Sequence, residues 1–115
     1  MTCFLSTSCF RGEKLNQAIE KCGKLSNNNV EISAPHPYES LKDLKNIFQK
    51  FVKNNYNFVF HNYFPTPKKS FVLNIASSED QIIKSCEDMC KSVIELSSYA
   101  NSNLYGIHAG YLSKA

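Results

Sequence analysis

The feature that most constrains the fold of this chain is a regular exchange between two hydrophobic periods. Short runs of β-forming residues alternate with longer segments whose apolar residues recur every three or four positions, as on one face of a helix. The pattern predicts strands at residues 3–7, 30–33, 57–61 and 104–108, and helices at residues 13–25, 40–53 and 78–99. The last helix is expected to begin with Ser78 as its cap, in a Ser-x-x-Gln capping box with Gln81. The predicted order is β-α-β-α-β-α-β.

Strands that alternate with amphipathic helices form a parallel sheet through right-handed crossovers, so the chain is predicted to be an α/β protein. Two architectures fit this order: an open doubly wound sheet, or part of a (βα)₈ barrel. No glycine-rich G-x-G-x-x-G motif follows the first strand, which weakens a nucleotide-binding interpretation. The 115 residues suit a single domain. A full barrel takes about 250 residues, so this chain corresponds to about half of one.

Composition and charge narrow the expected cellular compartment and the expected classes of partner. No stretch approaches the roughly 20 apolar residues of a membrane span, and the N-terminus lacks the basic region of a secretory signal. We therefore expect a cytoplasmic protein without a membrane partner. The formal charge of +3 is mild, and its lysines are mixed with acids, which predicts a solvated surface rather than a nucleic-acid interface. The five cysteines include no C-x-x-C pair and are interpreted as buried, unpaired thiols in a reducing compartment: Cys3, Cys9, Cys22, Cys86 and Cys90.

Two histidines fall at the C-terminal ends of predicted strands. His61 ends the third strand, and His108 ends the fourth strand before an Ala109-Gly110 turn. Ligand sites of α/β proteins gather at that end of the sheet, and catalysis in barrels takes place there. Because neutral imidazole binds zinc, manganese or iron, the two residues are candidate ligands of one metal ion. Alternatively, each is a hydrogen-bonded residue at a strand end, and the residues alone leave both interpretations open.

The connection over residues 62–77 is the least ordinary segment, because loops longer than about 12 residues are uncommon in compact domains unless they are functional. The order of three segments, His61 to Pro65, Phe71 to Ser77 and Tyr105 to Gly110, resembles the sugar phosphate isomerase/epimerase family. This family belongs to the xylose isomerase-like TIM barrel superfamily, which includes AP endonuclease family 2, a branch of zinc phosphodiesterases. Residues 6–9 and 30–33 agree with the resemblance. It covers essentially the whole chain but only the N-terminal half of the family's barrel.

The resemblance implies the N-terminal half of a xylose isomerase-like (βα)₈ TIM barrel, with four parallel strands and a chain truncated after strand four. In the endonuclease branch a histidine at each of the two matching positions binds metal, which implies His61 and His108 as ligands of a divalent ion (Mn, Zn or Mg). That branch has Pro-Gly after the second histidine, and here Ala109 replaces the proline. The family's acidic ligands and acid/base residues come mainly from later strands, beyond Ala115.

Further candidates flank these histidines. Glu31 on the second strand is a candidate catalytic carboxylate, or else a paired acid of the interior. His36, between two prolines, is a candidate substrate-binding residue or a solvent-exposed histidine. Tyr63 and Phe64 are expected either to wall a sugar pocket or to pack beneath the loop. The lysines at 68–69 are expected to meet a phosphate or to form a solvated loop tip.

The function expected from these observations is that of a fragment of a divalent-metal-dependent isomerase or epimerase acting on a sugar or sugar phosphate. One alternative is a fragment of an AP endonuclease-like zinc phosphodiesterase, whose partner would be nucleic acid. The second alternative is a non-catalytic half-barrel interaction module. Four strands cannot close a barrel, so the open edges are also expected to allow self-association. The isolated chain is expected to lack a complete active site.

Overall fold

The computed structural model describes residues 1–110 of the chain. Its helices and strands follow the order expected from the sequence, with a 3₁₀ turn added after the first strand. In chain order the elements are β1 (Leu5–Ser6), the 3₁₀ turn (Thr7–Phe10), α1 (Leu15–Ser26), β2 (Asn29–Ile32), α2 (Leu41–Lys53), β3 (Asn57–His61), α3 (Asp80–Ala100) and β4 (Tyr105–Gly106). The prediction of an α/β fold is confirmed.

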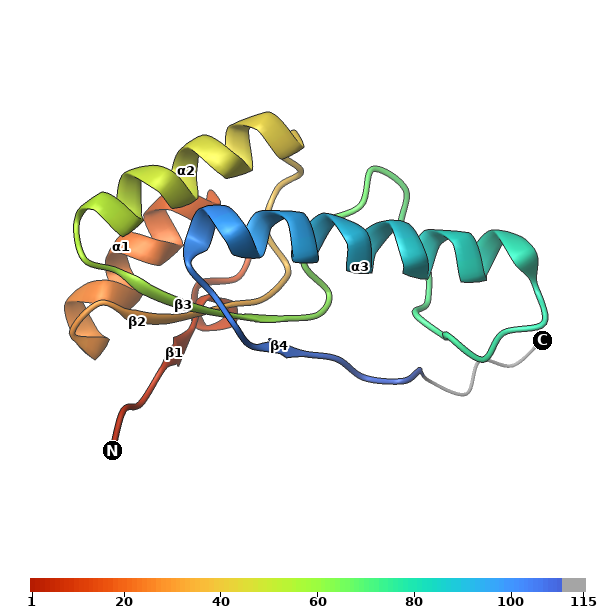
Figure 1. Cartoon of the computed structure of the whole chain (residues 1–115), viewed down its shortest axis with the longest axis horizontal. Coiled ribbons are helices and arrows are strands. Elements are labelled where there is room, and N and C mark those ends of the chain that lie inside the picture. The colour runs from red at the N-terminus through yellow and green to blue at the C-terminus, as the bar shows by residue number, and fades with distance from the viewer. Residues whose placement is uncertain (111–115) are drawn as a thin grey trace.

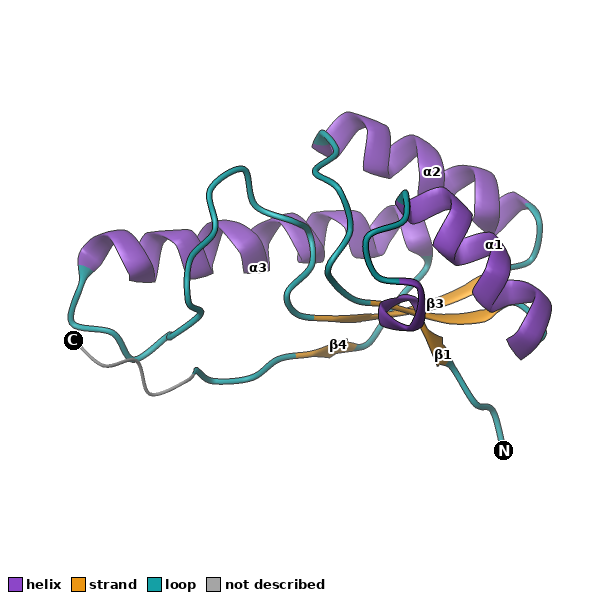
Figure 2. Ribbon diagram, turned by 180° about the vertical axis from the view of Figure 1, so that it is seen from behind, coloured by secondary structure: helices purple, strands orange, loops and turns teal. Residues whose placement is uncertain are grey.

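The four strands form one parallel sheet in the order β1-β2-β3-β4. The central pair, β2 and β3, is in register from Asn29 with Asn57 to Ile32 with Phe60. All three helices lie on the same side of this sheet (Figures 1 and 2). We call the opposite side the uncovered face, because none of the helices formed by residues 1–110 packs on it.

Side-chain alternation decides what the uncovered face carries. Phe58 and Phe60 are buried on the helical side of β3. Because successive residues of a strand point to opposite faces, Val59 and His61 lie on the uncovered face and are only partly buried. The same alternation in β2 places Glu31 on that face.

Phenylalanine rings form the centre of the core. Phe48 of α2 is completely buried, and its ring meets the rings of Phe58, Phe60 and Phe64 edge-on, with centroids 5.2, 5.2 and 6.0 Å apart. Edge-to-face pairs of this kind add to the stabilisation that comes from burial. Further side chains from all three helices and from β2 complete the cluster: Leu15, Ile19, Cys22, Val30, Ile32, Leu44, Phe51, Val93, Leu96 and Ala100.

The N-terminal half of α3 extends beyond the sheet, alongside the long loop that follows β3 (Figures 1 and 2). A second, smaller cluster fills this region and consists of Leu73 from the loop with Cys86 and Met89 from α3. The molecule is accordingly elongated, with principal extents of 44 × 26 × 25 Å. No helix within residues 1–110 is long and apolar enough to cross a membrane.

Some boundaries differ from the predictions. β1 and β4 are two-residue strands, shorter than expected, because each is an edge strand with one neighbour. The predicted capping role of Ser78 is wrong: α3 begins at Asp80 with Glu79 as its N-cap, and no side chain caps it. The nearby Ser77 Oγ instead accepts a hydrogen bond from the Glu79 N–H, at 3.1 Å.

The cysteines divide by position. Cys22 and Cys86 are buried as predicted, and burial raises the pKa of the Cys22 thiol to about 11. Cys90 is half-buried. For Cys3 and Cys9 the prediction of burial is wrong, because they lie in the segment before β1 and in the 3₁₀ turn, where their side chains are exposed.

Candidate functional site

The two candidate metal ligands lie next to each other. His61 is the last residue of β3, and His108 follows the neighbouring strand β4 by two positions. Their imidazole rings are 5.0 Å apart between centroids, at an interplanar angle of 80°. His61 is half-buried and His108 is exposed, so the pair is accessible from solvent. The fold therefore brings two residues that are 47 positions apart in the sequence to one edge of the sheet.

Gly106 makes room for the His61 ring. It pairs with His61 in the β3–β4 register. A Cβ atom at position 106 would lie only 3.0 Å from Cδ2 of the His61 imidazole. The absence of a side chain here allows the ring to lie against strand β4, on the side where His108 emerges.

Asn62 holds the end of β4 in place. Its main-chain N–H donates to the carbonyl of Gly106 at 3.2 Å, and its Oδ1 accepts from the main-chain N–H of His108 at 3.0 Å. The side chain is only 4% exposed, so these bonds are shielded from water. Asn62, which directly follows His61 in the sequence, thus fixes the backbone of His108. Sequence reasoning missed this role; the only signal was its place between a strand-end histidine and a long loop.

Two of the three segments on which the family resemblance rests, residues 71–77 and 105–110, also meet. Asn74 forms an antiparallel bridge with Gly110, and the N–H of Ile75 donates to the carbonyl of Ala109 at 3.1 Å. Gly110 has φ of +152°, and a Cβ at this position would lie 2.9 Å from the Asn74 Cα. Only glycine permits this approach of the two backbones. The long loop is therefore tied to the turn that follows His108.

His36 is not solvent-exposed, contrary to one of the two expectations for it. Its side chain is 5% exposed, and its Nδ1 lies 2.9 Å from the main-chain carbonyl of Glu13. The loop 34–38 folds back over the start of α1, where the Gly12 N–H also donates to the Pro35 carbonyl at 2.9 Å. The buried Nε2 has no hydrogen-bond partner. His36 is not part of the His61–His108 pair, because its Nδ1 lies against the Glu13 carbonyl instead.

Glu31 shares the uncovered face with His61 but lies deeper along the sheet, in register with Ser6 on β1 and Val59 on β3. Within residues 1–110 no group of three His, Cys, Asp or Glu side chains is arranged to hold a metal ion. The described part of the chain thus brings together two candidate ligands and adds no acidic ligand to them.

The loop residues separate into packing and exposed groups. Phe64 is buried in the phenylalanine core, so packing accounts for it. Tyr63 is half-buried, and its hydroxyl accepts a hydrogen bond from the Leu73 N–H at 2.9 Å. Lys68 and Lys69 are exposed, and Nζ of Lys68 lies 5.5 Å from the centre of the Tyr38 ring.

A cavity of about 420 Å³ opens beside the histidine pair, at the C-terminal ends of β2 and β3. We call it the rim cavity; it is lined by residues 33–35, Asn62, Tyr63 and residues 66, 67, 70 and 71 of the long loop. Asn62 connects the two features, since it lines the cavity and bonds to the backbone of His108. This end of a parallel sheet is where α/β proteins bind their ligands.

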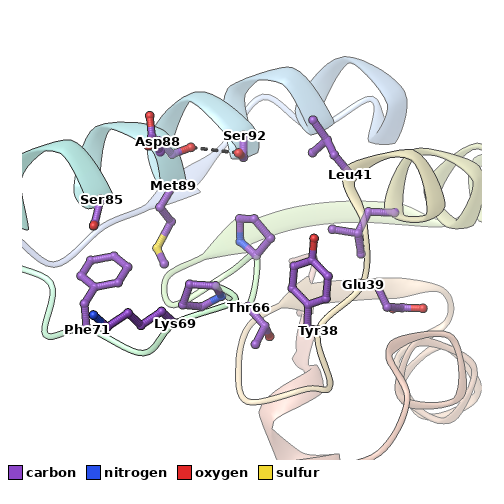
Figure 3. A pocket seen from close by; sticks show the side chains of 13 residues that line it. Tyr38, Glu39, Leu41, Thr66, Lys69, Phe71, Ser85, Asp88, Met89 and Ser92 are labelled. Atoms are coloured by element: carbon purple, nitrogen blue, oxygen red, sulfur yellow. Dashed lines mark hydrogen bonds between the residues drawn. The ribbon is translucent and has the colours of Figure 1, made fainter. Parts of the chain in front are cut away.

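A second cavity, of about 320 Å³, lies on the helical side between the start of α2, the long loop and α3 (Figure 3). Its walls include Tyr38, Glu39, Asp88 and Met89. Burial raises the pKa of the Glu39 carboxyl, and the negative charge of the nearby Asp43 raises it further. We call this second cavity the helix-side cavity. Neither histidine of the pair lines either cavity, but Asn62, which bonds to the His108 backbone, lines the rim cavity and not this one.

The fold and the site define an α/β protein with a two-histidine cluster at the C-terminal edge of a parallel sheet. Comparisons with known protein families, with curated proteins and with solved structures found no match for this chain.

Proposed function

We propose that this chain carries part of the active site of a divalent-metal-dependent isomerase or epimerase acting on a sugar or sugar phosphate, with His61 and His108 as two of the metal ligands. The observation that carries the proposal is the adjacency of the two imidazoles at the C-terminal ends of neighbouring parallel strands. In βα-barrels catalysis takes place at this end.

The separation of the rings suits a shared ion. Two imidazoles bound to one tetrahedral ion through nitrogen–metal bonds of about 2 Å have ring centroids about 5 Å apart. The observed distance is 5.0 Å. An edge-to-face aromatic contact also falls in this range, so the metal has to be tested directly.

The arrangement of the sheet supports a barrel parentage. Four parallel strands in sequential order, with every described helix on one side, are compatible with the N-terminal half of a (βα)₈ barrel. In such a barrel the uncovered face would be the inner face. Glu31, Val59 and His61 would then point into the barrel interior.

The chemistry also defines what a complete site needs. A bound divalent ion would polarise the carbonyl and the adjacent hydroxyl of a sugar. His61 and His108 would hold the ion, and Asn62 would keep the His108 backbone in place through its Oδ1. A working enzyme needs additional oxygen ligands and an acid/base group, which residues 1–110 do not bring to the pair.

The AP endonuclease alternative receives less support, because the rim cavity has no lysine or arginine in its walls to meet a nucleic-acid phosphate. The interaction-module alternative predicts no metal binding at all. One measurement therefore separates it from the proposal.

The test is calorimetric titration of residues 1–115 with Zn²⁺ and with Mn²⁺. We expect binding of one ion per chain, weakened in His61→Ala and in His108→Ala and lost in the double variant. His36→Gln is the matched control, because it removes the third histidine, which lies outside the pair. Metal binding that is absent, or that survives the double substitution, would rule out the proposed site.

A further inference from the structure

The walls of the rim cavity are uncharged and mostly apolar, with a few polar groups among them. None of the residues that line it is Asp, Glu, Lys, Arg or His. Hydroxyl groups come from Ser33, Thr66 and Ser70, and ring surface comes from Tyr63 and Phe71. Hydroxyls combined with ring surface suit a small molecule that presents both hydroxyl groups and C–H bonds.

One wall carries a buried hydrogen-bond donor that has no partner. The side chain of Asn62 is 4% exposed, and its Nδ2 makes no hydrogen bond. The orientation of the amide is fixed, because Oδ1 accepts from the His108 N–H at 3.0 Å and a flipped amide would turn a donor toward that N–H. Buried polar groups in native proteins are nearly always paired, since an unpaired one is costly. Nδ2 therefore lacks an acceptor, in a residue that lines the cavity.

We infer that the rim cavity binds the uncharged, hydroxyl-bearing part of a small ligand, and that Nδ2 of Asn62 donates a hydrogen bond to one of its oxygens. The inference deepens the proposed function and rests on it in taking this end of the sheet as the substrate end. Asn62 would then join the ligand to the metal pair, because its Oδ1 holds the backbone of His108 while its Nδ2 holds the ligand.

The absence of charge in the cavity walls sets its selectivity. The nearest loop lysines are directed elsewhere: Lys68 lies over the Tyr38 ring, and Lys69 lines the helix-side cavity. A phosphate group therefore gains no cationic partner from the walls of the rim cavity. A sugar and its phosphate ester are expected to bind there with similar affinity, through their shared hydroxyl groups.

Asn62→Asp tests the donor specifically. Aspartate has the same shape and keeps an oxygen to accept from the His108 N–H, but at neutral pH it cannot donate. The probes are D-fructose and D-fructose 6-phosphate, titrated calorimetrically into residues 1–115 with and without Mn²⁺. Asn103→Asp is the charge-matched control, because Asn103 is exposed and precedes β4 at the opposite end of the strand from His108.

We expect both probes to bind the wild-type chain and the Asn103→Asp chain with similar affinity, and to bind Asn62→Asp at least roughly tenfold more weakly, as the loss of a buried hydrogen bond predicts. Wild-type affinity in Asn62→Asp, or no binding of either probe by the wild type, would overturn the inference. So would a strong preference for the phosphate ester that persists in Asn62→Asp.

The same samples separate this inference from the proposed function. Metal binding that depends on both histidines, together with sugar binding indifferent to Asn62, overturns the inference alone. Sugar binding that depends on Asn62, in a chain that binds no metal, overturns the metal site alone. Should Asn62→Asp lose its native circular dichroism spectrum, Ser70→Leu replaces it as the test variant, because Ser70 is an exposed wall residue whose enlargement obstructs the cavity. Unchanged probe binding in Ser70→Leu would then count against the inference.

Discussion

At the scale of single residues, the histidine pair depends on a glycine that contributes no atom to it. Gly106→Ala would place a Cβ 3.0 Å from the His61 ring, and the ring is the part that has to move. A side chain pushed from its rotamer costs about 0.5–1.5 kcal/mol, so we expect zinc affinity to fall roughly two- to tenfold. The thermal midpoint should change little, because His61 is half-buried and lies outside the core. Calorimetry and thermal denaturation measure the two effects.

Gly12→Ala is the matched control and should behave in the opposite way. A Cβ at Gly12 meets nothing within 4 Å, but its φ of +83° is unfavourable for alanine. We expect a loss of about 1–2 kcal/mol in stability with unchanged zinc affinity. Equal zinc affinity in wild type and Gly106→Ala would show that the ring position does not matter for binding.

The half-buried carboxyl of Glu39 gives a pH-dependent prediction. Burial and the nearby Asp43 raise the pKa of Glu39, outweighing the opposite effects of His36 and Lys14. The folded state then holds its proton more tightly than the unfolded state, so stability falls as pH rises through the ordinary carboxyl range toward the raised value. Glu39→Gln removes this cost. We expect its thermal midpoint to exceed that of the wild type at pH 7 and the difference to vanish near pH 4, below the ordinary pKa of about 4.5.

The control for that series is Glu20→Gln, which removes the same charge from an exposed position on α1. Its midpoint should follow that of the wild type at both pH values. A gain of equal size in the two variants at pH 7 would assign the effect to net charge rather than to the burial of Glu39.

Single residues also show how far the sequence predicts the site. The positions of His61 and His108 at strand ends follow from the hydrophobic pattern, because parallel strands bring their C-terminal ends to one edge. The contribution of Asn62 does not follow, since its Oδ1 bonds to a residue 46 positions away. The burial of His36 was missed for the same reason: it depends on a carbonyl at Glu13, which only the folded chain brings near.

At the scale of secondary-structure elements, two serines near helix starts give a matched pair of predictions. Ser40 Oγ accepts from the Asp43 N–H at 3.1 Å and caps α2, whereas Ser78 makes no cap at the start of α3. Ser40→Ala should lower the free energy of unfolding by about 1 kcal/mol, as the loss of an N-cap does. Ser78→Ala should leave it unchanged. Urea denaturation measures both, and a comparable loss in Ser78→Ala would mean that Ser78 caps α3 after all.

The ends of the helices were easier to predict than the start of α3. Asn27 and Asn101 end α1 and α3 in the left-handed conformation, at φ of 51° and 48°. Asparagine tolerates that conformation better than other residues with a side chain, so asparagine after an amphipathic run is a dependable stop. A capping box is a weaker signal. Either of two adjacent serines, Ser77 or Ser78, can satisfy the pattern, and the loop geometry decides between them.

At the scale of the whole molecule, the alternation of strands with long amphipathic segments predicts the parallel sheet. It leaves the strand order open between a doubly wound sheet and part of a barrel, and the structure shows the sequential order β1-β2-β3-β4. The alternation does not predict that the N-terminal half of α3 extends beyond the sheet. That arrangement depends on the second cluster, in which Leu73 packs against Cys86 and Met89. The loop that supplies Leu73 has no strand or helix pattern of its own, so its packing role is not visible in the sequence.

The two clusters predict that the molecule opens in two parts. The phenylalanine core joins α1, α2 and the second half of α3 to the sheet, while the Leu73 cluster joins the first half of α3 to the loop. Leu73→Ala, at a completely buried position, should cost about 2–5 kcal/mol. We expect this loss to speed amide hydrogen exchange mainly in the first three turns of α3, whereas Phe48→Ala should speed it throughout.

Ile75→Ala, on the same loop but 50% exposed, is the control and should leave exchange unchanged. Native-state hydrogen exchange measures all three variants, because local openings and global unfolding appear as separate free energies. If Leu73→Ala accelerated exchange equally in α1, α2 and α3, the two clusters would form one cooperative unit, and the loop that flanks the rim cavity would be as stable as the core.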